Sequence, residues 1–389
     1  MINLDRQFSI DKLKEILRIN TANPPGNEED VAKNLRYLFE SYGIETELVP
    51  HSEGRVNLIA NLRGRNTKKF RRVLGLSGHM DVVPPGDVKW DYNPYAADEV
   101  DGKIYARGAC DMKSGLMSCV MAMITLKEED VQLDGDIKLL ASVGEETGAV
   151  GAKQLVDEGY AEDLDALIIA EPSGGDIVVS HKGAFWTQIT CYGKTAHGSR
   201  PHHGINAVLH IHEIINQILS EDFQLKYEPD PLLGEPTYSI NVINGGSNTN
   251  VVPDQCSVNI DFRTVPSQDH QDIIDELNRV IETVRKQYPE LKADISILNN
   301  LAPLNTQEND PFVHILQEVL QERTSELKEP KGMTGYTDSS QFMKALNNFP
   351  IIVWSTIDGK TAHQPNEYVE IEKYLKGIDL FKAIAQKYL

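Results

Sequence analysis

Four short apolar segments of the chain each lead to an acidic or histidine residue. The segments are 74–78, 137–144, 166–170 and 351–354, and they lead to His79, Glu145 with Glu146, Glu171 and His363, respectively. Short, continuous apolar segments are typical of strands buried on both faces of a parallel sheet. In an open parallel sheet, ligands bind beyond the carboxyl ends of the strands, so we expect these side chains to meet at one edge of the sheet.

The pattern of strands and helices changes after about residue 180. Before it, apolar segments alternate with helical segments, which predicts an α/β domain with a mostly parallel sheet flanked by helices. The next 120 or so residues combine alternating strands with two helices, which is typical of a compact α+β unit, and the tail returns to the first pattern. We therefore predict a discontinuous catalytic domain, residues 1–179 and 299–389, with a smaller α+β domain, residues 180–298, inserted into it.

Charge and hydropathy argue against several classes of protein. The 389 residues include 58 acidic and 38 basic side chains, a formal charge of −20, so nucleic acid is not an expected partner. The longest apolar run, 115–126, is shorter than the roughly 20 residues that span a bilayer, so no membrane association is expected. The first ten residues lack the basic and apolar segments of a signal peptide, and the four cysteines form no CxxC pair. These features predict a cytoplasmic protein without a disulfide scaffold.

Asp111 adds a fifth potential metal ligand at the start of the predicted helix 115–126. It joins four residues that follow the apolar segments, namely His79, Glu146, Glu171 and His363. Imidazole and carboxylate groups without a thiolate suit a divalent ion such as Zn²⁺, Co²⁺ or Mn²⁺.

Two local spacings fit the chemistry of a metal centre. His79 and Asp81 are two residues apart, so on an extended backbone Asp81 can accept a hydrogen bond from the second ring nitrogen of His79. Glu145 and Glu146 are adjacent and project in different directions. One of them can bind metal while the other serves as a general base.

Each of these features also has a simpler interpretation when it is taken alone. A His-x-Asp motif is more often a surface or turn pair, and a Glu-Glu pair is more often solvated. Cys110, next to Asp111, is expected to be a small buried thiol. The histidines at 202, 203, 210 and 212 are predicted to be surface residues, because the last two do not share a helix face. The ordered combination, rather than any single motif, indicates a metal site.

The motifs resemble those of the di-zinc amidohydrolase family that includes acetylornithine deacetylase, succinyl-diaminopimelate desuccinylase, aminoacylase and carboxypeptidase G. The resemblance extends from about residue 20 to the C-terminus and keeps the family's order. The segments that carry it are SGHMDVVPPGD, YARGACDMKSG, GEETGAVGA, AEPSG, GKTAHGSRPHHGINA, GGSNTNVVPD, DFRTVP and TAHQPNE.

The resemblance implies a role for each residue of the centre. Asp111 bridges two divalent metal ions, most readily Zn²⁺, with His79 and Glu171 on one ion and Glu146 and His363 on the other. Glu145 is the general base for a water that attacks an amide carbonyl, and Asp81 orients His79. The inserted domain is ferredoxin-like and serves as lid and dimerisation domain, and His197 reaches the active site of the partner subunit in a homodimer. Without the resemblance, His197 would be taken for a polar loop residue.

The resemblance also implies a small N-acylated amino acid as the substrate. Its carboxylates would be held by cationic or amide side chains, for which the candidates are Lys182, Arg200, Arg263 and Asn250. The similar branch is succinyl-diaminopimelate desuccinylase, which releases succinate and L,L-diaminopimelate from N-succinyl-L,L-diaminopimelate in the formation of lysine and cell-wall precursors.

One departure keeps other substrates open. Desuccinylases carry Arg-Arg-Gly where this chain has His181-Lys182-Gly183, the form associated with acetylornithine deacetylases, and lysine lacks the bidentate fork of arginine. Acetylornithine deacetylase and metallo-dipeptidase are therefore alternatives with the same centre. A non-catalytic dimeric scaffold is the alternative outside enzymes, and the complete set of ligands with Glu145 and His197 argues against it.

Overall fold

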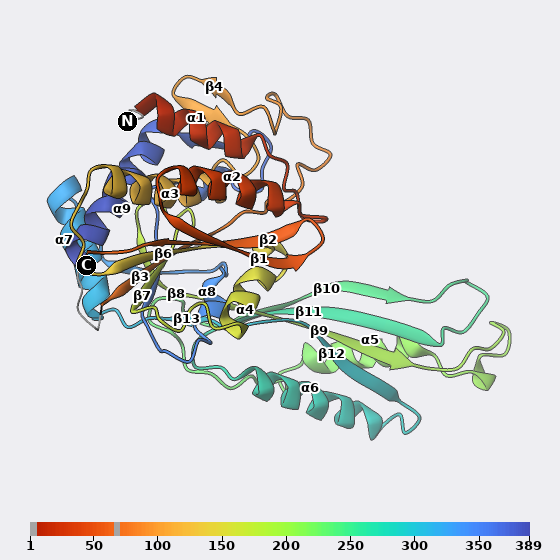
Figure 1. Ribbon diagram of the computed structural model, residues 1–389. Coiled ribbons are helices and arrows are strands. Elements are labelled where there is room, and N and C mark those ends of the chain that lie inside the picture. The colour runs from red at the N-terminus through yellow and green to blue at the C-terminus, as the bar shows by residue number, and fades with distance from the viewer. Residues whose placement is uncertain (1–5, 66–70) are drawn as a thin grey trace. The chain divides into compact units, whose positions relative to one another are not determined.

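The computed structural model describes residues 6–65 and 71–389, so the first five residues of the N-terminal segment lie outside it (Figure 1). Its α-helices are α1 (Arg6–Leu17), α2 (Glu28–Ser41), α3 (Lys113–Glu128), α4 (Val150–Asp157), α5 (Ala207–Ile218), α6 (His270–Arg285), α7 (Pro311–Thr324), α8 (Ser339–Phe342) and α9 (Ile371–Tyr388). Its strands are β1 (Glu45–Ser52), β2 (Arg55–Leu62), β3 (Val73–His79), β4 (Asp98–Val100), β5 (Lys103–Tyr105), β6 (Asp136–Ser142), β7 (Ala166–Ile169), β8 (Ile177–His181), β9 (Gly183–Tyr192), β10 (Thr237–Gly245), β11 (Gln255–Thr264), β12 (Lys292–Leu301), β13 (Leu304–Asn305), β14 (Pro330–Met333), β15 (Ile351–Val353) and β16 (Tyr368–Glu370). Three short 3₁₀ helices are η1 (Glu145–Thr147), η2 (Pro201–His203) and η3 (Gly359–Thr361).

The chain forms two compact units. The larger one consists of the described parts of Met1–Ser180 together with Leu304–Gly332 and Thr337–Leu389, and the smaller one consists of His181–Pro303 with Met333–Tyr336. The larger unit has a sheet with parallel strands flanked by helices, and the smaller one combines a sheet with two helices. The predicted fold class is confirmed. The use of the smaller unit as a lid or dimerisation domain stays a prediction.

The larger unit is built on a nine-stranded mixed sheet with the path β1-β2-β6-β3-β7-β15-β8-β13 and with β14 beside β8. The four central strands, from β6 to β15, are parallel, whereas β1–β2, β2–β6 and β15–β8 are antiparallel pairs. Every residue of these four strands is buried, which explains their continuous apolar sequences. Helices α1, α2, α3 and α9 lie on one side of the sheet and α4 and α8 on the other (Figure 1).

The register of the central strands positions the predicted ligands. His79, the last residue of β3, lies opposite Ser142, the last residue of β6. The amide of Ala170, just after β7, donates to the carbonyl of Ser77 in β3. The three strands therefore end at nearly the same level, and the residues that follow them lie at one edge of the sheet.

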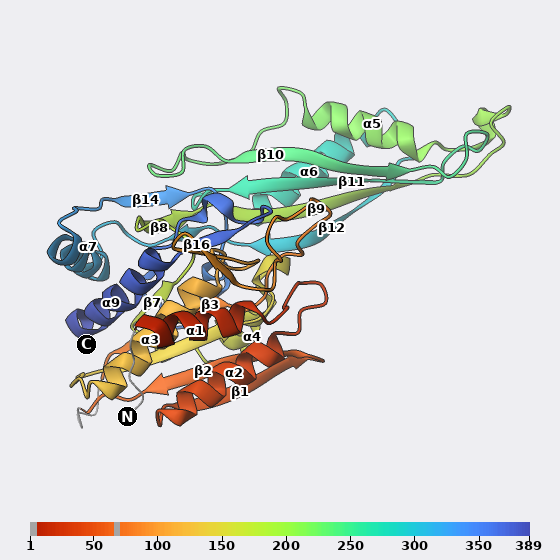
Figure 2. The same ribbon diagram turned by 90° about the horizontal axis from the view of Figure 1, so that it is seen from above.

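The smaller unit is an antiparallel sheet, in the order β10-β11-β9-β12, with α5 and α6 packed on one face (Figure 2). In β11 buried residues alternate with partly exposed ones, as expected for a strand with one covered face. Its core is apolar and includes Phe185, Ile211 and Leu277. Asn206 and Asp269 cap α5 and α6 by accepting backbone hydrogen bonds.

One predicted surface residue is buried. His202, His203 and His212 are exposed, but His210 is only 3% exposed and packs near the ring of Tyr288. The prediction is wrong for His210, because its side of α5 faces the core while His212 lies on the other side of the helix. No helix in the described ranges is long and apolar enough to cross a membrane.

Candidate metal centre

The five predicted metal ligands form two overlapping clusters in the larger unit. In the first, His79 Nε2 lies 3.3 Å from Asp111 Oδ1 and 3.6 Å from Glu171 Oε1. In the second, His363 Nε2 lies 3.2 Å from Asp111 Oδ2 and 3.1 Å from Glu146 Oε1. Asp111 contributes one oxygen to each cluster, so its carboxylate is placed to bridge two ions.

Both clusters fit a divalent cation. The candidate ligand atoms of each lie within 4.8 Å of one another. Ligand atoms around a tetrahedral zinc ion with bonds of about 2.0–2.2 Å are about 3.3–3.6 Å apart, close to the distances that separate the imidazoles from the carboxylates here. One imidazole with two carboxylates, and no thiolate, is a donor set for Zn²⁺, Co²⁺ or Mn²⁺.

The electrostatics of the centre reflect a group of buried carboxylates. Burial raises the pKa of Glu171 well above its usual range, and the charge of Asp111 raises it further. Hydrogen bonds to Asp111 and Glu146 raise the pKa of His363 to about 10. Burial also works to raise the pKa of Asp111, but the hydrogen bonds from His363 and His79 outweigh it and hold this pKa low. The excess of negative charge is what bound cations would neutralise.

Asp81 connects the first cluster to the turn that carries Glu145 and Glu146. Its side chain is fully buried, and its Oδ1 lies 3.4 Å from His79 Nδ1, while the same nitrogen is 2.9 Å from the main-chain oxygen of Asp81. The carboxylate accepts the backbone N–H groups of Glu145 at 3.1 Å and of Glu146 at 3.3 Å. Asp81 is therefore placed to orient the turn as well as the imidazole.

Two further features hold this turn. Asn23 Nδ2 donates to Asp81 Oδ2 at 2.9 Å and to Thr147 Oγ1 at 2.8 Å. Gly144 precedes Glu145 at φ +70°, and a Cβ there would lie 2.5 Å from Val150 Cγ2, so the turn requires glycine. The sequence indicates Asn23 only as part of the turn Asn23-Pro24-Pro25-Gly26, and its contact with Asp81 could not be predicted.

Asp338 is a buried carboxylate beside the centre that the sequence did not indicate. It is 1% exposed, and its Oδ2 accepts a hydrogen bond from the hydroxyl of Ser142 at the end of β6. Burial raises the pKa of Asp338 to about 6. Its segment, Thr337–Ser340, has neither apolar periodicity nor a ligand-like spacing, so no signal marks it.

The other predicted functional residues belong to the smaller unit, where His197 and Asn250 lie next to each other. The amide of Gly198 donates to the main-chain oxygen of Asn250 at 2.7 Å, and both His197 and Asn250 are exposed. The backbone N–H of Ser199 donates to His197 Nδ1 at 3.1 Å. The same nitrogen also lies 2.8 Å from Ser199 Oγ, so Ser199 positions the imidazole through both its backbone and its side chain.

The three cationic candidates differ in their surroundings. Lys182 is 6% exposed, and its Nζ donates to the main-chain oxygen of Glu235 at 2.6 Å. Arg263 pairs with Asp261 at 3.0 Å, and Arg200 is exposed. Of the three candidates, Lys182 is buried, Arg263 is partly exposed and Arg200 is at the surface.

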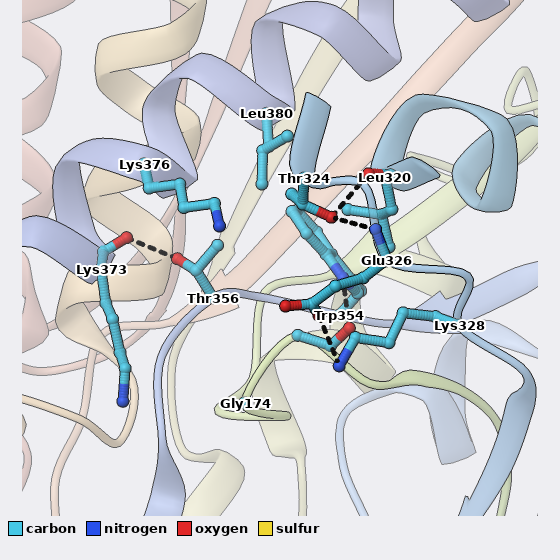
Figure 3. A pocket seen from close by; sticks show the side chains of 11 residues that line it. Gly174, Leu320, Thr324, Glu326, Lys328, Trp354, Thr356, Lys373, Lys376 and Leu380 are labelled. Atoms are coloured by element: carbon cyan, nitrogen blue, oxygen red, sulfur yellow. Dashed lines mark hydrogen bonds and ion pairs between the residues drawn. The ribbon is translucent and has the colours of Figure 1, made fainter. Parts of the chain in front are cut away.

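A separate pocket of ≈ 220 Å³ lies elsewhere in the larger unit (Figure 3). Of its lining lysines, Lys328 pairs with Glu326 at 3.1 Å and Lys373 with Glu370 at 3.0 Å. The hydroxyl of Thr356 donates to the main-chain oxygen of Lys373. None of the five clustered residues lines this pocket, so the pocket is not part of the candidate metal centre.

The chain is similar to known proteins in sequence and in fold. A family model described as Peptidase family M20/M25/M40 matches residues 75–387. A protein of Staphylococcus aureus (strain N315), described as a probable succinyl-diaminopimelate desuccinylase, is 34% identical over 418 residues, which cover 100% of this chain and 99% of that protein. The crystal structure of aminopeptidase PepT from Bacillus cereus matches with a TM-score of 0.78 at 23% identity, covering 98% of both chains. A Bacillus subtilis protein described as a dinuclear metal-binding peptidase of the M20 family matches with a TM-score of 0.73 at 18% identity, covering 99% of this chain and 98% of that one.

Proposed function

Because the chain belongs to peptidase family M20/M25/M40 and is a metallohydrolase, we propose that it cleaves the amide bond of an N-acylated amino acid, with N-succinyl-L,L-diaminopimelate as the substrate. The observation that carries the proposal is the pair of three-residue clusters that share the carboxylate of Asp111. A full-length relative described as a probable succinyl-diaminopimelate desuccinylase supports the choice of substrate.

The ligand sets are His79, Asp111 and Glu171 for one ion and Asp111, Glu146 and His363 for the other. Zn²⁺ is the expected metal, with Co²⁺ or Mn²⁺ as substitutes. When bound, such ions polarise an amide carbonyl and lower the pKa of water, which supplies a nucleophile at neutral pH.

Glu145 acts as the general base and then as the general acid. It belongs to neither cluster, yet it is next to the ligand Glu146, and its backbone N–H is held by Asp81. Its carboxylate takes a proton from the attacking water and returns it to the nitrogen of the leaving amine. The amide carbon–nitrogen bond breaks as that nitrogen is protonated.

His197 stabilises the negative charge that develops on the amide oxygen, acting across a homodimer in the active site of the partner subunit. The contacts of Nδ1 with Ser199 support this role, because they engage that nitrogen within the loop and leave Nε2 as the atom that would face the substrate. Arg263, Asn250, Lys182 and Arg200 hold the carboxylates of the substrate. A cytoplasmic location stays a prediction.

An N-acetylated amino acid such as N-acetylornithine is the second candidate substrate. The observation in its favour is His181-Lys182-Gly183, in which the lysine lacks the fork that suits a second carboxylate. The buried ammonium of Lys182 already donates to the main-chain oxygen of Glu235, which leaves it fewer donors for a succinyl group.

A substrate panel tests the proposal. We expect kcat/KM of the zinc-loaded protein for N-succinyl-L,L-diaminopimelate to exceed that for N-acetylornithine and for dipeptides by 10³ or more, about 4 kcal/mol of transition-state binding. Similar, weak rates across the panel would contradict the substrate but leave the amide chemistry in place. Glu145→Gln is the matched control for that chemistry, because we expect it to retain metal and lose most of kcat.

A further inference from the structure

Glu367 is fully buried and holds the loop that carries Asp111. Its Oε2 accepts hydrogen bonds from Arg107 Nη1 at 2.5 Å and from the amide of Gly108 at 3.1 Å. Its Oε1 accepts the amides of Cys110 at 2.9 Å and of Asp111 at 3.0 Å. The side chain of Glu367 is 0% exposed, and each of its oxygens is engaged by two donors. It is therefore not a candidate metal ligand.

The loop depends on this carboxylate because its amides belong to no strand or helix. A buried N–H group without an acceptor is costly, and three such groups converge on one side chain here. Gly108 adopts φ +81°, and a Cβ at this position would lie 2.5 Å from Val82 Cγ1, so the loop is also tightly packed. Its conformation, and with it the position of the Asp111 backbone, is thus defined by Glu367.

The same residue links Asp111 to the second histidine ligand. His363 is four residues before Glu367 and adopts φ +61°, a left-handed conformation that is uncommon for residues other than glycine. Arg107 Nη1 also donates to the main-chain oxygen of Gln364 at 3.4 Å, and Thr361 Oγ1 lies 3.7 Å from Cys110 Sγ. The segment of His363 and the loop of Asp111 are therefore held together by contacts around the buried Arg107–Glu367 ion pair.

We propose that Glu367 is the positioning residue of the metal centre: by gathering the amides of the 108–111 loop it holds the Asp111 carboxylate between the two clusters and sets the affinity for metal. The inference rests on the proposed metal centre. It goes beyond the ligand set, because Glu367 acts through Asp111 and His363 and does not touch an ion.

The test is Glu367→Gln. Glutamine has the same size, but its NH₂ group replaces one of the two carboxylate oxygens. That group cannot accept a hydrogen bond, so two of the four donors lose their acceptor. We expect the affinity of the metal-free protein for Zn²⁺, measured by calorimetric titration, to fall by 10- to 100-fold, the range found when hydrogen-bond partners of metal ligands are removed. Glu370→Gln is the control, because Glu370 lies on the same segment and forms an ion pair with Lys373 near the surface. The Zn²⁺ affinity of this variant should stay within about twofold of the wild-type value.

A second measurement separates positioning from general stability. Hydrogen exchange of the metal-free protein should show faster exchange at Gly108, Cys110 and Asp111 in Glu367→Gln, with unchanged exchange in the core of the smaller unit. A variant that melts at a lower temperature but binds Zn²⁺ with wild-type affinity well below its melting point would overturn the proposal. If Glu367→Gln does not fold, Glu367→Asp serves instead, since the shorter carboxylate keeps the charge but cannot reach all four donors.

The double variant Arg107→Gln/Glu367→Gln tests whether charge balance alone is involved. It removes both partners of the buried ion pair and leaves the loop amides short of acceptors. We expect its metal affinity to stay low, and a return to wild-type affinity would reject positioning in favour of simple charge compensation. If the wild-type protein binds no Zn²⁺ in the same titration, the proposed metal centre itself is wrong. If the wild type binds Zn²⁺ and Glu367→Gln binds it equally well, the metal centre stands and only the positioning role of Glu367 is rejected.

Discussion

The candidate metal centre in the larger unit and the candidate residues of the smaller unit are built in different ways. Three of the five candidate ligands lie at or soon after the ends of buried strands, and the buried carboxylates of Asp81 and Glu367 accept hydrogen bonds from the backbone of the loops that carry candidate ligands. His197 and Asn250 lie on exposed segments that are joined by backbone hydrogen bonds, such as the one from the Gly198 amide to the Asn250 carbonyl. The candidate ligands are thus held in place by buried contacts within the larger unit itself, whereas His197 and Asn250 lie at the surface of the smaller unit.

The two units are also stabilised differently. Around the ligands, stability depends on buried polar groups whose hydrogen bonds are made by particular partners, and such groups are costly when a partner is lost. The smaller unit has a core of aliphatic and aromatic side chains between one sheet face and two helices. Substitutions that damage one kind of structure should therefore leave the other largely intact.

The largest effect is expected for Asp111→Asn, which tests whether the two clusters form one site. Asn keeps the size of the side chain but removes the charge shared by both clusters. We expect loss of both metal ions and a fall in kcat/KM of about 10⁴ or more, over 5 kcal/mol of transition-state stabilisation. Metal content by atomic spectroscopy and kinetics check this. Retention of one full equivalent of metal would show that the clusters are independent.

Phe185→Ala tests the separate core of the smaller unit. Phe185 is fully buried in that core and lies against the rings of Phe262 and His270. Truncating a buried phenylalanine costs about 3–5 kcal/mol through lost burial and the cavity that remains. We expect chemical denaturation to show this loss, while Zn²⁺ affinity under native conditions stays close to that of the wild type. Equal damage to metal binding would mean that the two units are not separable in stability.

His197→Ala tests whether the smaller unit supplies a group to catalysis. Removing an oxyanion donor lowers kcat by about 10²–10³, or about 2.7–4 kcal/mol. We expect this loss without a change in metal content or in melting temperature, because the side chain of His197 is exposed. His202→Ala, an exposed histidine five positions along, is the control and should retain full activity. A fully active His197→Ala would remove this residue from the mechanism.

The fold class could be predicted, and candidate ligands could be selected, because both depend on local sequence patterns. The strands β3, β6, β7 and β15 are buried on both faces and so are largely apolar, and three of the five candidate ligands lie at the end of such a strand or within four residues of it. Asp111 and His363 lie on irregular segments. The sequence pattern made them candidate ligands, but the division of the five residues between two ions came only from the resemblance. The general principle is that strand ends are visible in a sequence, but the loops that complete a site are not.

The residues that hold the loops could not be predicted. Arg107 and Glu367 form a buried ion pair across 260 residues of sequence, and neither belongs to a periodic segment. Asp338 is likewise marked only by burial next to Ser142. His210 was missed for a simpler reason, since two histidines on opposite faces of a helix cannot both be at the surface when one face is covered by a sheet. Such contacts are set by tertiary packing.

The smallest effect concerns His181, a polar exception inside the smaller unit. Its side chain is fully buried, and burial lowers its pKa to about 4. Because the folded state binds this proton less readily than the unfolded state, whose histidine pKa is about 6.5, the contribution of His181 to stability is complete above that pH and is lost as the pH falls toward 4. The slope is at most about 1.4 kcal/mol per pH unit. Urea denaturation at several pH values from 7 to 4.5 should show a shallower decline for His181→Gln than for the wild type. His212→Gln, at an exposed site, is the control, and its stability should follow that of the wild type across this pH range. Parallel plots of unfolding free energy against pH for all three proteins would mean that His181 is not a source of acid sensitivity.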